Sequence, residues 1–105
     1  MTTYDYIRRA KVVAILQHEE LSFGSLLRAV RLVLGYKMKA VSADIGISPR
    51  TLENIEYNRF HRPLREEYIR NLAQYYGVPH DYLVYKAKQQ LEVNHGQVKN
   101  APTTN

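Results

Sequence analysis

The 105 residues predict an all-α fold, with a domain of five short helices, one extra helix before it and a short flexible tail after it. Apolar residues recur at spacings of three and four along most of the chain, which is the period of a helix buried on one side. Proline and glycine stand at the starts and ends of these stretches, as helices require. No stretch of useful length alternates apolar and polar residues as a strand would. The length and the apolar fraction of 45% suit a single core.

Residues 1–21 predict an N-terminal helical extension, with a helix from Tyr4 to about His18. Its apolar residues lie on two sides, so one side is free to meet a partner after the other has packed on the domain. The preferred interpretation is an extra core helix, and a dimer element is the alternative. The helices of the main domain, residues 22–92, are predicted at 23–34, 38–45, 49–57, 64–76 and from 79 onward.

The ends of these helices have recognisable signals. Ser48 suits an N-cap, and Pro49 follows it at the first helical position. Gly35, Gly46 and Gly77 suit left-handed helix ends, and Asn58 is the commonest substitute for glycine there. Residues 93–105 are polar and have no apolar period, which predicts a disordered tail.

The formal net charge of +5 is concentrated in the middle of the chain. Residues 21–62 contain seven basic and three acidic residues, a net charge of +4, whereas the first twenty residues are neutral overall. A focused basic segment favours an anionic partner over a merely solubilising surface.

Two short helices joined by a turn with a glycine, the second capped by Ser48 and Pro49, are typical of a helix-turn-helix, whose second helix enters the DNA major groove. A more specific signal is a pattern of residues spaced over most of the chain. Its members are Leu27–Arg31, Gly35, Val41, Ile45–Ser48, Thr51–Leu52, Ile55–Glu56, Leu72–Ala73, Gly77–Val78 and Asp81–Leu83. With this spacing, residues 22–84 resemble the lambda-repressor-like (Cro and Xre) family. The resemblance implies a five-helix lambda-repressor-like helix-turn-helix domain that binds DNA.

Helical geometry divides residues 49–57 into two faces. Leu52, Ile55 and Glu56 share one side, and the opposite side is polar. Arginine pairs well with guanine and asparagine with adenine, so Arg50 and Asn54 are the leading base readers. The resemblance adds positions in the first turn, and the full predicted base-reading set is Pro49, Arg50, Thr51, Glu53 and Asn54.

Phosphate contacts are predicted on both sides of this helix, from basic side chains, hydrogen-bonding side chains and helix N-termini. The predicted set is Lys37, Met38, Lys39, Ser48, Tyr57, Asn58, Arg59, His61 and Arg62. Three residues depart from the family: Met38 replaces a common glutamine, Pro49 occupies a base-reading position without a hydrogen-bonding side chain, and Asn58 replaces a glycine. These departures bear on base preference and not on the fold.

Glu56 lies on the inward side of its helix, where a carboxylate needs a partner. Arg31 is the natural candidate, because the resemblance places an arginine and a glutamate that often pair at these two positions. A partly buried ion pair between Arg31 and Glu56 is therefore predicted.

Other functional classes find little support. The absence of cysteine excludes disulfide scaffolds, thiolate metal sites and cysteine nucleophiles, and it favours a reducing compartment. The longest apolar stretch, Val12–Leu16, is too short to span a bilayer, so a cytoplasmic protein is expected. The four histidines lack metal-ligand spacing, and no catalytic or phosphate-loop motif is present. We expect no enzymatic activity, no cofactor and no metal.

The sequence thus predicts a sequence-specific regulator of transcription that binds double-stranded DNA. One short recognition helix reads only a few base pairs, so a homodimer on an inverted repeat is expected. Its design resembles repressors of phage or mobile-element operons, which often repress their own operon. The alternative is an antitoxin-type module that binds a protein partner through the N-terminal helix or the tail, and DNA secondarily. General DNA packaging is weaker still, because the basic charge is focused on one motif.

Overall fold

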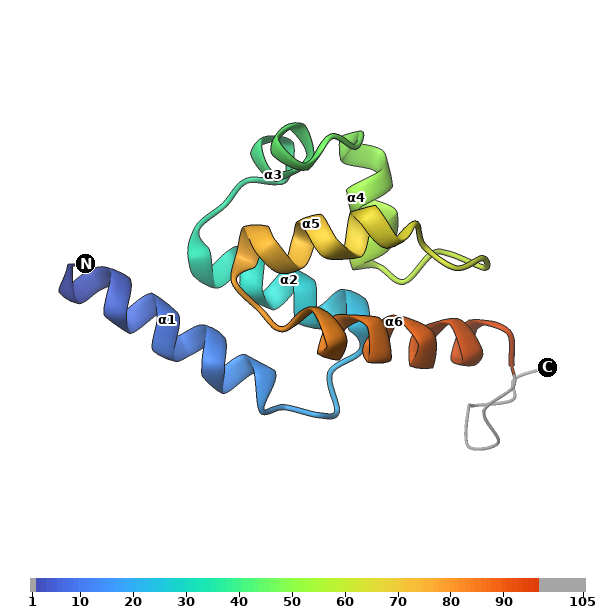
Figure 1. The fold of residues 1–105 in the computed structure, drawn as a ribbon, viewed down its shortest axis with the longest axis horizontal. Coiled ribbons are helices and arrows are strands. Elements are labelled where there is room, and N and C mark those ends of the chain that lie inside the picture. The colour runs from blue at the N-terminus through green and yellow to red at the C-terminus, as the bar shows by residue number, and fades with distance from the viewer. Residues whose placement is uncertain (1, 97–105) are drawn as a thin grey trace.

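The computed structural model describes residues 2–96, which form six helices and, within that range, no strand (Figure 1). The all-α prediction with an additional N-terminal helix is confirmed. Residues 97–105, most of the predicted tail, lie outside the described part of the chain. The helices are α1 (Thr3–Leu16), α2 (Phe23–Leu34), α3 (Met38–Ile45), α4 (Pro49–Glu56), α5 (Glu66–Tyr76) and α6 (His80–Asn94).

Helix α2 lies at the centre and packs against α1, α4 and α6. Apolar residues recur at helical spacing along its inner face and form a continuous stripe. Burying this stripe stabilises the fold by about 25 cal/mol for each Å² of apolar surface removed from water. Helix α3 packs on α4 and α5, and α5 packs on α6, so every helix touches one core. The largest apolar side chains that are completely buried are Phe23, Leu26, Leu27, Leu52, Ile55, Leu72 and Leu83.

Helix α1 lies along α2, on the side of the molecule away from α3 and α4 (Figure 1). Val12 is buried, and Ile15 and Leu16 pack against the core from the same side. Tyr6 and Val13 remain exposed on the opposite side. The apolar surface of this helix is therefore two-sided, and the domain covers only one of the two sides.

Helices α2 and α4 approach each other closely at Gly24. A methyl group on this glycine would lie 2.4 Å from the carbonyl oxygen of Glu56 and 2.7 Å from Oδ1 of Asn58. Only a residue without a side chain allows the two helices this separation, which fixes α4 relative to the centre of the core.

Three helix boundaries differ from the prediction by two residues. Helix α1 ends at Leu16 instead of about His18. Helix α5 begins at Glu66 instead of residue 64, because Glu66 and Glu67 in its first turn favour a helix start there. Helix α6 continues to Asn94, past the expected boundary at residue 92. Its last turn is held by tertiary contacts, because Nδ2 of Asn94 donates to the carbonyl oxygens of Asn58 and Phe60. Residues 93 and 94, which the prediction placed in the tail, are thus the last residues of α6.

Candidate nucleic-acid interface

Helices α3 and α4 form a helix-turn-helix whose turn is set by local chemistry. Gly46 ends α3 in the left-handed conformation, at φ 80°, which residues with a Cβ rarely adopt. Oγ of Ser48 accepts a hydrogen bond from the backbone nitrogen of Thr51 at 3.0 Å, and Pro49 occupies the first turn of α4. These signals start α4 at a fixed position and direction relative to α3.

The two faces of α4 are those that helical geometry predicts. Leu52, Ile55 and Glu56 are almost completely buried, whereas Arg50 and Glu53 are exposed. The exposed face is therefore polar and available to a partner. Among the predicted base readers, Pro49, Arg50 and Glu53 are exposed, and Thr51 and Asn54 are half-buried.

Arg59 and Tyr57 lie next to Asn54 at the end of α4. Nη1 of Arg59 donates to Oδ1 of Asn54 at 3.3 Å, and the Arg59 guanidinium lies 5.0 Å from the centre of the Tyr57 ring. On α2, the guanidinium of Arg28 lies 5.7 Å from the same ring. The Tyr57 ring thus contacts two arginines, Arg28 and Arg59, beside the predicted base-reading face. Sequence reasoning did not assign Arg28 a site role, because only the tertiary packing of α2 on α4 brings it here.

The buried end of α4 is anchored by the predicted ion pair between Arg31 and Glu56. Nε and Nη2 of Arg31 donate to the two carboxylate oxygens of Glu56 at 2.7 and 3.0 Å. Nη1 of Arg31 also donates to the carbonyl oxygen of Tyr36 at 3.0 Å. The hydrogen bonds to Glu56 raise the pKa of Arg31 above its ordinary value. This two-bond geometry holds the recognition helix in one orientation on α2.

Asn58 has a structural role that the prediction of a phosphate contact did not include. It is the only non-glycine residue of the described range with a positive φ, 59°, which confirms the predicted left-handed helix end. Its Oδ1 accepts from the backbone nitrogen of Gly24, and its Nδ2 donates to Oγ of Ser22. The side chain is therefore held at the start of α2, where its oxygen and one of its two N–H donors are used.

Ser48 and Tyr57 cap the two ends of α4, and the other predicted phosphate contacts lie at two places. Lys37, Met38 and Lys39 stand at the start of α3, and Arg59, His61 and Arg62 follow α4. The lysines and arginines of this set are exposed, and within residues 2–96 none of them forms an ion pair with a carboxylate. Met38 is half-buried and packs against the core. Exposed cations without acidic partners on both sides of one helix produce a positive potential that attracts an anion.

Two other features were sought in residues 2–96, a metal site and a membrane-spanning helix. No group of three or more histidine and acidic side chains is placed to hold a metal ion within that range. None of the helices there is long and apolar enough to cross a membrane.

Comparison with protein families places this geometry among known domains. A family model described as a helix-turn-helix domain matches residues 24–88, which include α3, α4 and most of the core. Neither the search of curated proteins nor the search of solved structures found a match. Because the model covers more than half of the chain and contains the helix-turn-helix seen in the structure, the chain belongs to the helix-turn-helix domain family.

Proposed function

We propose that this protein is a lambda-repressor-like (Cro and Xre) transcriptional regulator that reads double-stranded DNA with α4. The observation that carries the proposal is the exposed polar face of α4, bordered by cations that have no acidic partner in the described chain. Arg50 would contact guanine, and Asn54 would contact adenine in the major groove. Lys37, Lys39, Arg59 and Arg62 would bind the flanking phosphates.

The proposal includes a cytoplasmic homodimer on an inverted repeat, with half-sites about 34–36 Å apart. It assigns a repressor role, in the manner of phage and mobile-element repressors, to occupation of an operator that overlaps a promoter. It assigns no catalytic role. The exposed apolar residues of α1 and α6, such as Tyr6, Val13 and Tyr85, are available for the dimer contact.

Selection of binders from a random duplex DNA pool tests this proposal. The wild-type protein should enrich an inverted repeat. Arg50→Ala or Asn54→Ala should weaken binding to it by about 1–3 kcal/mol and relax the preference at one base pair. Arg70→Ala is the matched control, because Arg70 is an exposed arginine on α5, outside the proposed interface. Binding that shows no preferred sequence, or that is unaffected by both α4 variants, would refute the proposal.

A second candidate, an antitoxin-type protein that binds a protein partner, is favoured by the exposed side of α1. This side carries Tyr6, Ile7 and Val13, each about half exposed or more, on a helix that the family match does not include. Sedimentation of the purified protein separates the two candidates. A dimer that Val13→Asp disrupts favours the homodimeric regulator, and a monomer whose α1 is needed to neutralise the product of an adjacent gene favours the antitoxin.

A further inference from the structure

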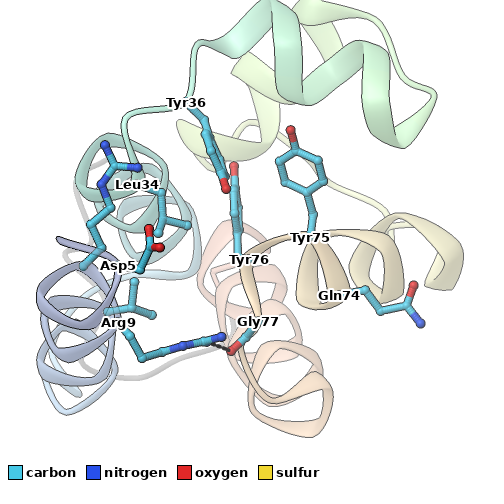
Figure 2. A pocket seen from close by; sticks show the side chains of 10 residues that line it. Asp5, Arg9, Leu34, Tyr36, Gln74, Tyr75, Tyr76 and Gly77 are labelled. Carbon is cyan, nitrogen blue, oxygen red and sulfur yellow. Dashed lines mark hydrogen bonds between the residues drawn. The ribbon is translucent and has the colours of Figure 1, made fainter. Parts of the chain in front are cut away.

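A cavity of about 250 Å³ lies where α1 meets the ends of α2 and α5, outside the proposed DNA-binding surface (Figure 2). Its walls belong to three separate parts of the chain. Helix α1 contributes two arginines, the turn after α2 contributes one tyrosine, and the end of α5 contributes two tyrosines and an amide. The residues on which the argument depends are Arg8, Arg9, Tyr36, Tyr75, Tyr76 and Gln74.

The α1 wall is cationic, and its hydrogen-bonding capacity is only partly used. Nη1 of Arg9 donates to the carbonyl oxygen of Gly77 at 3.1 Å, as Figure 2 shows. Nη2 of Arg8 donates to the hydroxyl of Tyr4 at 2.8 Å, whereas Nε of Arg8 is buried and has no hydrogen-bond partner in the described chain. Buried donors normally have a partner, so the missing partner at Nε shows that the protein does not fully satisfy the guanidinium of Arg8.

Hydrogen bonding to the free carbonyl groups of a helix C-terminus explains the position of only one of the two arginines. Both side chains lie near a helix C-terminus, Arg9 at Gly77 after α5 and Arg8 at Gly35 after α2. Arg9 bonds the carbonyl of Gly77, but the described structure has no hydrogen bond from Arg8 to a backbone carbonyl. Asp5 is the one carboxylate of the lining, and it accepts a hydrogen bond from the backbone nitrogen of Thr2 at the start of α1. The lining is therefore net positive by one charge.

The opposite wall is aromatic. The rings of Tyr36 and Tyr75 meet edge to face at 5.3 Å between centres, and those of Tyr75 and Tyr76 do so at 5.7 Å. Tyr76 is 3% exposed, and its hydroxyl has no hydrogen-bond partner in the described chain. Burial raises the pKa of this hydroxyl above its ordinary value. Tyrosine walls with a few polar groups are typical of sites for small molecules that contain a flat ring.

The tyrosines of the cavity are also connected to both helices of the helix-turn-helix. The carbonyl oxygen of Tyr36 accepts from Arg31, which in turn pairs with Glu56 at the end of α4. The hydroxyl of Tyr75 donates to Oδ2 of Asp44 on α3 at 2.6 Å. A molecule held against this wall would therefore contact the residues that position α3 and α4.

We propose that this cavity binds a small aromatic carboxylate, with the carboxylate on Arg8 and Arg9 and the ring against the tyrosine wall. A guanidinium fork matches the two oxygens of a carboxylate, and the volume is below the usual range for drug-sized ligands, which limits the occupant to about one ring. Binding itself does not depend on the proposed function. Its consequence, a changed affinity for DNA, rests on that function.

Three probes test the inference by NMR on the full chain without DNA. Benzoate supplies the ring and the charge, benzamide supplies the ring without the charge, and acetate supplies the charge without the ring. Benzoate should shift the backbone amide signals of Gly35, Tyr36 and Gly77 with a dissociation constant on the order of 1 mM or lower. The other two probes should bind at least about tenfold more weakly, because each lacks one half of the recognition.

Variants assign the response to the two arginines. Arg8→Gln and Arg9→Gln should each abolish saturable benzoate binding, and Arg70→Gln, on the exposed side of α5, should leave it unchanged. Arg8→Lys keeps the charge without the fork and should bind with intermediate affinity, which provides a test if a glutamine variant does not fold. Absence of saturable shifts up to about 10 mM benzoate, an equal response to benzamide, or an unchanged response in Arg8→Gln and Arg8→Lys would overturn the inference.

The consequence for DNA is measured separately, by titrating the selected operator with and without saturating benzoate. The affinity for the operator should change at least about fivefold, a typical allosteric coupling. Loss of this change in Arg8→Gln would connect it to the cavity. Absence of DNA binding both with and without benzoate counts against the proposed function alone, whereas DNA binding without any saturable benzoate site counts against this inference alone.

Discussion

The buried ion pair between Arg31 and Glu56 gives the sharpest test of how α4 is held. In Glu56→Ala the guanidinium of Arg31 keeps its bond to the carbonyl oxygen of Tyr36 but loses both carboxylate bonds. The Glu56 side chain is 0% exposed and that of Arg31 is 11% exposed, so water replaces the lost bonds poorly. Removing one partner of such a pair costs about 3–5 kcal/mol.

Thermal unfolding followed by circular dichroism measures this cost. At about 4–8 °C per kcal/mol for a domain of this size, Glu56→Ala should lower the Tm by at least about 12 °C. Glu53→Ala is the matched control, since Glu53 lies on the same helix but is exposed, and it should change stability by no more than about 0.5 kcal/mol.

A double variant separates the loss of stability caused by the unpaired charge of Arg31 from the loss caused by poorer packing. Arg31→Met combined with Glu56→Leu removes both charges and keeps apolar volume, so it should be more stable than Glu56→Ala alone. A Tm for Glu56→Ala within about 2 °C of the wild type would refute the reasoning, because the pair would then contribute less than about 0.5 kcal/mol.

Three further results are expected. Gly24→Ala should destabilise the protein even though alanine favours helices, because the new methyl group would overlap the backbone of Glu56. Denaturant unfolding measures this, with Ser25→Ala at the exposed neighbouring position as control. A Gly24→Ala variant more stable than the wild type would contradict the expectation. Asn58→Ala should cost about 1–3 kcal/mol in the same assay, while Asn58→Gly should recover the part that comes from the left-handed backbone; equal losses in the two would show that backbone strain contributes nothing. Finally, log affinity for DNA should fall against log salt with a slope of about −4 to −5 per monomer, and Arg59→Ala should reduce the slope by about 1; a flat salt response would exclude the proposed phosphate contacts.

Local signals made most of the fold predictable. The helix ends at Gly35, Gly46, Gly77 and Asn58 depend on a backbone conformation that few residue types adopt. The positions of glycine and asparagine in the sequence therefore locate these ends. The buried face of α4 follows from the angle between successive residues of a helix. The family resemblance, rather than geometry, identified Arg31 as the partner of Glu56.

Features that depend on distant residues were not predictable in this way. The last turn of α6 has no apolar period, and it is ordered because Asn94 reaches the loop after α4. Asn58 lies beside the predicted interface in the sequence, yet its side chain is used by Ser22 and Gly24, more than thirty residues away. The cavity beside Arg8 and Arg9 exists only because α1 docks across the ends of two other helices.

The hydrogen bond between Arg59 and Asn54 bears on how the protein rejects a wrong sequence. Reading adenine needs the amide oxygen of Asn54 as an acceptor, and that oxygen already accepts from Arg59. In the proposed complex a correct base pair supplies a replacement donor and frees Arg59 for the phosphate backbone. A guanine or thymine edge has no amino group to donate, so Asn54 keeps its internal partner there. Discrimination is then a competition between the DNA and the protein's own side chain, and its strength can be adjusted by a residue that contacts no base.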